Sequence, residues 1–358
     1  MKTTKIFLMA ALALTFAACS NEDNDLTPQQ TAEQPADNMI TITAQLAPKS
    51  GSALTRAVAD NDDNKITVTW AVDETLKIIS ANGHNATATI TAVDGTTGAA
   101  TISFTIDAAA KGQNCTIIYP ADAAVTESAG EYTANPITAQ DGTLKAALDV
   151  RIGKGTITDK TTPTLNVTTE PEAQFAIFKF AVKNLDASAT IDVTPLGIKI
   201  GSQNYTITPT SATSTLYAAL PATSSEHVVF SATGSDSKYY TFAKKDITFS
   251  AGNFYQTTLK MSVTHSSLAV NDVIKVGESV YSSSSIYVKY GTSNSTINCN
   301  NLGVYTLVVD GGKYKWQPSK GNIINTRVSV SGSSDGIYVV SGGGTSSSDR
   351  MTFAAHTN

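Results

Sequence analysis

Apolar and polar residues alternate along much of the chain, a pattern typical of strands with one buried and one exposed face. The alternation is clear in residues 40–46, 66–72, 100–106 and 255–263. Residues 175–182 are instead apolar in both phases, which predicts a bulged strand or one that is covered on both sides. Short helical turns are expected at 107–111 and 121–124 alone. The chain is therefore predicted to be built almost entirely of strands.

Strands that follow one another without intervening helices favour an all-β fold of antiparallel sandwiches. Breaks near 160–163 and 265–270 divide the body of the chain. Three units are expected, over residues 38–162, 163–265 and 266–358.

Composition narrows the possible functions. The chain has 358 residues and is 41% hydrophobic, which is enough for two or three domains with cores of their own. Charged residues make up 15% and the net charge is -5, so no basic field is available to hold a phosphate backbone. Nucleic acid is therefore not expected among the partners.

The N-terminus is expected to be a targeting segment. Lys2 and Lys5 precede an apolar run over 6–18 that is too short to span a bilayer and matches a signal peptide, residues 1–18. The sequence Phe-Ala-Ala-Cys ending at Cys19 resembles a bacterial lipobox, which implies a lipid on that cysteine. An ordinary secretory peptide with a chance cysteine is the alternative.

Residues 19–37 are predicted to be an acidic tether, because they contain five acidic residues, two prolines and no basic residue. Acidic residues directly after the lipidated cysteine resemble the export signal that carries some lipoproteins to the outer face of the outer membrane. The expected location is therefore the cell surface. Two further cysteines, Cys115 and Cys299, can pair in an oxidising compartment or stay independent, and independence is favoured.

Several phrases together resemble the fimbrillin family, the pilins and pilus-associated lipoproteins of type V pili. One is Thr-Trp-Ala-Val-Asp-Glu-Thr-Leu-Lys-Ile at 69–78, in which Asp73-Glu74 stands where the family frequently has Gly-Asp. The others are Cys-Thr-Ile-Ile-Tyr-Pro at 115–120, the apolar run at 175–182, Leu-Tyr-Ala-Ala-Leu-Pro at 216–221 and Ala-Gly-Asn-Phe-Tyr at 251–255. The resemblance covers residues 1 to 265.

The resemblance implies two tandem transthyretin-like β-sandwich domains, followed here by an extra β-rich C-terminal unit. It also implies assembly by donor-strand exchange with other pilin subunits. In that scheme an Arg-specific protease removes the lipid-bearing leader and the first strand. The apolar residues of the exchanged strand would be Ile40, Ile42, Ala44 and Leu46.

The cleavage site implied by the resemblance is the bond between Arg56 and Ala57. Arg56 is the one Lys or Arg between Lys49 and Lys65, and its polar flank suits an exposed loop. A solvated loop arginine is the alternative. Cutting there would release the first strand and leave an open sheet edge and an apolar groove.

The C-terminal unit, 266–358, is longer than the short strand that a shaft pilin needs in order to donate. An accessory or tip subunit is therefore expected rather than a shaft subunit. The unit is rich in tyrosine around Trp316, so it could bind a host glycan or protein receptor. Two alternatives stay open: these rings are ordinary core, or the chain is a permanently tethered glycan-binding lipoprotein.

Enzymatic chemistry is not expected. The four histidines are isolated, so no metal site and no cofactor is predicted. Gly-Ser-Ser-Asp-Gly at 332–336 matches the pattern of a nucleophile elbow, but expected strands on both sides favour a hairpin turn. The expected function is structural and adhesive.

Overall fold

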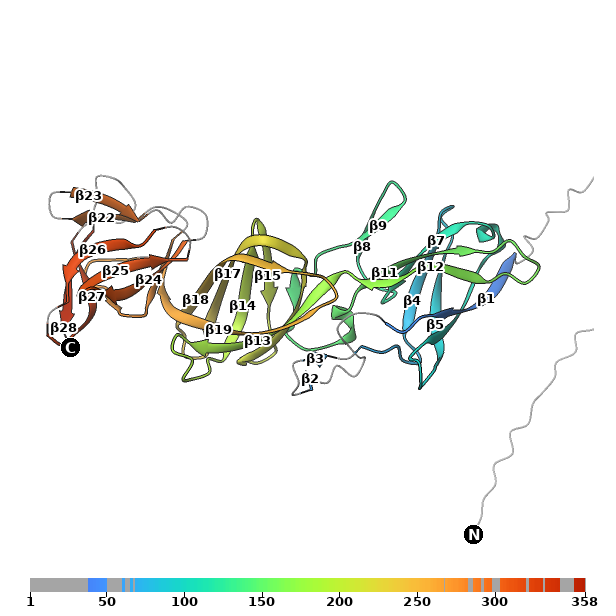
Figure 1. Cartoon of the computed structure of the whole chain (residues 1–358), viewed down its shortest axis with the longest axis horizontal. Helices are drawn as coiled ribbons and strands as arrows, with labels where there is room; N and C mark the ends of the chain where they lie inside the picture. Colours follow the sequence, from blue (N-terminus) through green and yellow to red (C-terminus); the bar gives the residue numbers. More distant parts are fainter. Residues whose placement is uncertain are drawn as a thin grey trace, which may run out of the picture. The chain divides into compact units, whose positions relative to one another are not determined.

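The computed structural model describes residues 38–49, 60–61, 65–66, 68–266, 268–282, 286–290, 293–297, 303–319, 322–330, 332–341 and 351–357. Residues Met39–Asn358 form one unit. Strands dominate it, which confirms the all-β prediction (Figure 1). The described residues include two 3-10 helices, η1 (Ala108–Ala110) and η2 (Ala146–Leu148). None of their helices is long and apolar enough to cross a membrane.

The first sheet has seven strands in the order β1-β6-β5-β4-β7-β11-β12, all paired antiparallel. Its strands are β1 (Met39–Leu46), β6 (Ala100–Asp107), β5 (Asn85–Val93), β4 (Thr75–Ser80), β7 (Asn114–Tyr119), β11 (Arg151–Ile157) and β12 (Leu165–Ala173). Two small ribbons accompany it, β2 (Asp60–Asn61) with β3 (Lys65–Ile66) and β8 (Val125–Ser128) with β9 (Glu131–Ala134).

The core of this sheet is built by the alternation that the sequence shows. Every second residue of β4 and β6 is buried, and these side chains join those of β1, β5 and β7 in one apolar cluster. The alternation at 66–72 is the exception, since Val68 and Trp70 are buried without lying in a strand. The prediction of a strand there was wrong because burial in a loop can give the same pattern as burial in a strand.

The second sheet contributes side chains to two further apolar clusters. Its order is β10-β15-β14-β17-β18-β19-β21-β24-β25-β26, and β13 pairs with both β16 and β19. The strands of its first part are β10 (Ala139–Gln140), β13 (Phe175–Asn184), β14 (Val193–Ile200), β15 (Gln203–Ile207), β16 (Thr215–Pro221), β17 (Thr223–Gly234), β18 (Tyr239–Phe249) and β19 (Phe254–His265).

Strand β13 is paired on both sides, as its doubly apolar sequence predicts. Its first four residues are all buried, because alternate side chains enter two different clusters. The pairing of β13 with β19 is parallel, unlike the antiparallel pairing expected throughout. A parallel partner 77 residues away along the chain leaves no local signal in the sequence.

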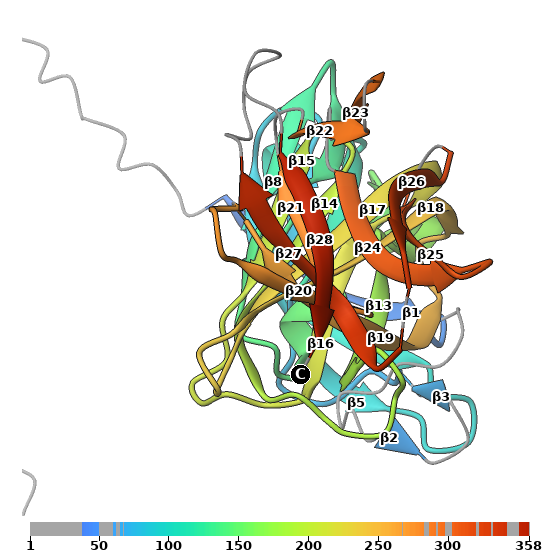
Figure 2. The ribbon, with the colours of Figure 1, turned by 90° about the vertical axis from the view of Figure 1, so that its left-hand side faces the viewer.

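Several of the C-terminal strands contribute to a third apolar cluster. The C-terminal strands are drawn in orange to red (Figure 2). They are β20 (Val273–Lys275), β21 (Ser279–Ser282), β22 (Ile286–Tyr290), β23 (Ser293–Ile297), β24 (Gly303–Asp310), β25 (Lys313–Pro318), β26 (Ile324–Ser329), β27 (Ser334–Ser341) and β28 (Thr352–Thr357). Strands β20, β27 and β28 form a sheet of their own. The third apolar cluster is the core of this C-terminal part.

The boundaries between the three expected units stay predictions, but the strand pairing bears on them. Strand β12 lies beyond residue 162 and still pairs with β11 of the first sheet. A small cluster joins Val150, from before residue 162, with Phe175 and Ile177, from after it. Strand β19 ends at His265, yet its last residues pair with β21.

Candidate functional site

The strand that was expected to be exchanged is β1, and it lies at the edge of the first sheet (Figure 1). All eight of its residues pair antiparallel with β6, from Met39 opposite Asp107 to Leu46 opposite Ala100. No second described strand hydrogen-bonds to it in the sheet order. Removing β1 would therefore break one ladder and leave β6 as the new edge.

The inner face of β1 is part of the core. Ile42, Ala44 and Leu46 are buried and Ile40 packs against the same cluster, while the alternate residues are exposed. Fully burying an Ile or Leu side chain is worth about 1.5–3 kcal/mol. The strand is thus held by side-chain burial as well as by its ladder, and its departure would uncover an apolar groove.

The chain just after β1 is fixed by two hydrogen bonds. The backbone N–H of Ala47 donates to Oε2 of Glu170 at 3.1 Å, and Nε1 of Trp70 donates to the carbonyl of Ala47 at 2.8 Å. Glu170 belongs to β12, the strand at the other end of the first sheet. These contacts direct the next residues, Pro48 and Lys49, into the protein.

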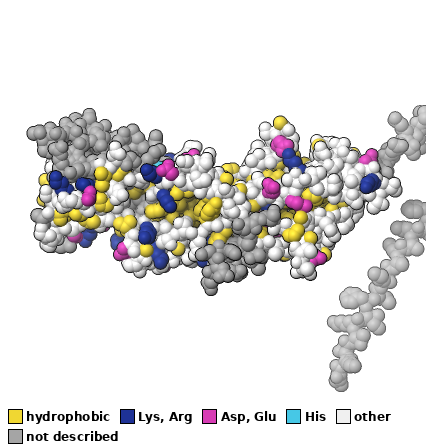
Figure 3. All heavy atoms as spheres, viewed as in Figure 1, with side chains coloured by type: hydrophobic (Ala, Val, Ile, Leu, Met, Phe, Trp, Pro, Cys, Tyr) yellow, Lys and Arg dark blue, Asp and Glu magenta, His cyan; other side chains and the backbone are white. Residues whose placement is uncertain are grey.

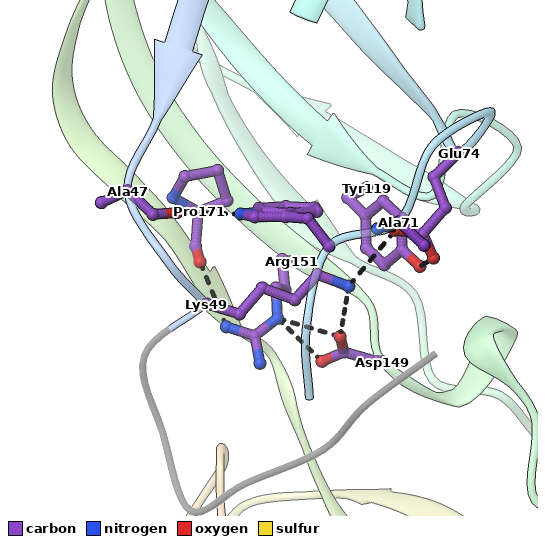
Figure 4. Close-up of polar contacts among 9 residues, drawn as sticks. Ala47, Lys49, Ala71, Glu74, Tyr119, Asp149, Arg151 and Pro171 are labelled. Atoms are coloured by element: carbon purple, nitrogen blue, oxygen red, sulfur yellow. Dashed lines mark hydrogen bonds and ion pairs between the residues drawn. The ribbon is translucent and has the colours of Figure 1, made fainter. Parts of the chain in front are cut away.

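Lys49 occupies a buried pocket of carboxylates and aromatic rings (Figure 4). Its Nζ lies 3.1 Å from Oδ2 of Asp149 and 3.9 Å from Oε2 of Glu74. The same atom lies 3.7 Å from the ring centroid of Tyr119 and 4.3 Å from that of Trp70. An ammonium group over two ring faces and beside two carboxylates gains cation–π and ion-pair attraction, which opposes the cost of removing the charge from water.

The two carboxylates are held in place by groups other than Lys49. Glu74 accepts from the backbone N–H of Ala71 at 3.0 Å and from the hydroxyl of Tyr119 at 2.5 Å. Asp149 accepts from Nε of Arg151 at 2.9 and 3.0 Å. Arg151 also donates to the carbonyl of Pro171 at 3.4 Å. The pocket is therefore built by the protein around the ammonium.

All four charged side chains of this pocket are removed from water. The exposed fraction is 1% for Lys49 and for Arg151, 4% for Glu74 and 6% for Asp149. Two positive and two negative groups make the set neutral. Burial lowers the pKa of Lys49 from its usual value of 10.5, although Asp149 and Glu74 oppose this shift. We name these residues, with Trp70 and Tyr119, the Lys49 pocket.

The sequence did not reveal the Lys49 pocket as a site. Trp70, Glu74 and Tyr119 stood in the phrases that carried the family resemblance, and Lys49 served merely to mark the isolation of Arg56. Asp149 and Arg151 meet Lys49 in space from about one hundred residues away in sequence. The one local signal is that Asp149 and Arg151 flank a buried valine at the start of β11.

Three of the predicted site residues fall outside the described residues. They are the lipidation site Cys19 and the two residues of the expected cleavage site, Arg56 and Ala57. Lys49 is the last described residue before the segment that contains the cleavage site, and description resumes at Asp60. Lipidation and cleavage stay predictions.

The cysteines and the elbow motif carry no visible chemistry in the described residues. Cys115 is buried and free, and burial raises the pKa of its thiol to about 11; Cys299 lies outside the described residues. Gly332 and Ser334 do not form the expected hairpin, because β26 pairs with β25 whereas β27 pairs with β20 and β28. No group of three or more described His, Cys, Asp and Glu side chains could hold a metal ion.

Four aromatic residues of the C-terminal part belong to its core: Tyr305, Tyr314, Trp316 and Phe353. Trp316 is 0% exposed and packs edge-on against Phe353 with 6.2 Å between ring centroids, and Tyr305 and Tyr314 lie in the same cluster. A fully buried ring cannot stack on a sugar. The hypothesis of glycan binding through Trp316 was therefore wrong, and the alternative of ordinary core residues describes these rings.

Charges are dispersed on the face seen in Figure 3. Lys and Arg side chains alternate with Asp and Glu side chains, and no large patch of one sign forms among the described residues of this face.

Comparisons with known proteins add the following likenesses. No protein-family model and no curated protein matches the chain. A candidate cell adhesion protein from Bacteroides uniformis is similar at 15% identity and a TM-score of 0.35, over 63% of this chain and 94% of that one. A fimbrial protein from Bacteroides ovatus is similar at 11% identity and a TM-score of 0.28, over 78% of this chain and 58% of that one. The TIE protein of Bacillus anthracis follows at 8% identity and a TM-score of 0.18, over 80% of this chain and 48% of that one.

The function proposed below takes its support from the contacts of β1 and Lys49 in this chain.

Proposed function

We propose that this chain is a structural and adhesive subunit of a type V pilus. It is exported as a lipoprotein with its lipid on Cys19, reaches the cell surface, and loses its leader and first strand through cleavage after Arg56. It then takes a strand from another subunit into the vacated groove. No enzymatic role is proposed.

The observation that carries the proposal is the position of β1. It is an edge strand whose inner side chains complete a core made of later residues, and its ladder joins it to β6 alone among the described strands. A strand of this kind can leave without breaking the rest of its sheet. Because the uncovered edge and apolar groove are costly in water, they favour uptake of another strand.

The C-terminal part of the chain supports an accessory or tip position in the pilus rather than a position in its shaft. Several of the C-terminal strands contribute to a third core that includes Val280, Leu307 and Ile337. A separately packed region beyond the second core offers surface for contacts that a repeating shaft subunit does not need. Its receptor is a host glycan or protein, and it does not use the buried Trp316 ring.

The test of the proposal is assembly of cleavage-site variants in the native cell. Arg56→Ala and Arg56→Lys both remove the arginine, and the second keeps the charge. We expect both variants to keep their lipid and to stay out of surface fibres, while Lys65→Ala, a change at the next basic residue, assembles normally. Normal assembly of Arg56→Ala would refute the cleavage scheme.

A further inference from the structure

The groove that β1 fills ends in the Lys49 pocket. We propose that this pocket is a recognition site for a basic side chain of any strand that enters the groove. The occupant is a strand of another subunit with four alternating apolar residues, followed by a lysine or arginine three positions after the last of them. This inference rests on the proposed function, because a vacated groove is its starting point.

Apart from Lys49 itself, the residues of the pocket belong to the part of the chain that would remain after cleavage. Lys49 precedes Arg56, whereas its partners Trp70, Glu74, Tyr119, Asp149 and Arg151 all follow it. Release of the first strand would therefore remove the ammonium and leave the carboxylates and rings behind. The cut subunit would then carry a site without its lysine. Lys49, which filled this site before cleavage, shows that a basic side chain fits it.

Charge makes the site selective. Glu74 and Asp149 together carry two negative charges, and Arg151 supplies one positive charge. Among these described side chains the sum is one negative charge, which the ammonium of Lys49 balances. A neutral side chain would leave that charge buried beside two rings, which is strongly unfavourable.

The pocket is shaped before the ligand arrives. The hydrogen bonds from Ala71 and Tyr119 fix Glu74, and Arg151 fixes Asp149 through both of its carboxylate oxygens. A preorganised site spends little free energy on ordering its own groups when the ligand binds.

The spacing of the required strand follows from β1. Its inner residues occupy every second position up to Leu46, and the ladder with β6 ends at that residue. Trp70 and Glu170 then fix Ala47 through both of its backbone polar groups. A basic residue three positions after the last inner residue is thus delivered into the pocket.

The experiment uses the full chain with a site for a sequence-specific protease inserted after Arg56. After cutting, the chain is incubated with an equimolar mixture of three peptides spanning residues 38–50, and native mass spectrometry measures which peptide is taken up. The peptides carry the natural sequence, Lys49→Gln, or Gln45→Lys with Lys49→Gln. The third is the matched control, because it keeps the charge but moves it to the exposed face of β1.

We expect uptake of both variant peptides to be at least about tenfold lower than uptake of the natural peptide. Equal uptake of all three would overturn the recognition site while leaving strand exchange intact. If the third peptide matched the natural one, general charge attraction would replace the pocket as the explanation. If no peptide entered, including an isotope-labelled copy of the natural strand, strand exchange itself would be refuted and the recognition site with it.

Discussion

The replacement Lys49→Gln in the uncut chain is the strongest test of how the first strand is held. It removes the ammonium from between Asp149 and Glu74, at 3.1 and 3.9 Å, and leaves both carboxylates buried. Removing one partner of a buried charge pair costs about 3–5 kcal/mol. At a urea dependence of about 2 kcal/mol per M, the unfolding midpoint should fall by about 2 M.

Fluorescence of Trp70 is a suitable probe, because Trp70 contacts Lys49 directly and the chain has only 2 tryptophans. A Trp316→Phe background makes Trp70 the single emitter, so that unfolding of the first sheet is followed by itself. The matched control is Lys154→Gln, which breaks an ion pair to Glu131 whose two side chains are 50% and 66% exposed. That change should cost about 1 kcal/mol or less.

A double variant separates charge from packing. In Lys49→Gln with Glu74→Gln, Arg151 and Asp149 remain as a neutral pair. The loss of stability should therefore be smaller than the sum of the two single losses, by about 0.5–3 kcal/mol. The reasoning is refuted if Lys49→Gln is no more destabilising than Lys154→Gln.

Three further outcomes are expected. Because burial lowers the folded-state pKa of Lys49 below 10.5, the unfolded chain holds this proton to higher pH. In urea titrations, the unfolding free energy of the natural chain relative to Lys49→Gln should therefore rise with pH in the window just below 10.5, and a fall would contradict this. With a thiol pKa of about 11, Cys115 should resist iodoacetamide at about pH 8 until the protein is denatured, as peptide mapping can show; rapid labelling of the folded chain would disagree. Gly153→Ala should lower the melting temperature, because the added Cβ would lie 2.7 Å from the carbonyl oxygen of Thr169. The control Gly95→Ala places its Cβ in open space and should be tolerated, so equal effects of the two variants would argue against the close approach of β11 and β12.

The sequence predicts those strands whose side chains alternate between core and water. Strands β1, β6 and β19 follow the alternating runs, and the doubly apolar run is β13, which has partners on both sides. The same rule failed at 66–72, where Val68 and Trp70 are buried in a loop. Alternation reports burial, and burial is not confined to strands.

The sequence predicted part of the candidate site, the strand β1, but not the Lys49 pocket. The four apolar residues of β1 were readable, because each lies at a position of regular alternation. Lys49 was not, because a lysine after a strand is ordinarily solvated and its partners are supplied by loops and strands far along the chain. Whether Trp316 belongs to a core or to a binding surface stayed open for a related reason, since a sequence does not show whether an aromatic ring faces a core or water.

The measurement that tests the central claim most directly is the N-terminal sequence and intact mass of the protein recovered from surface fibres of the native cell. An N-terminus at Ala57 is predicted, which would mean that the lipid, the first strand and Lys49 have left and that the groove has accepted another strand. A diacylated N-terminus at Cys19 in assembled fibres would contradict it, because β1 and Lys49 would then still be covalently joined to the subunit.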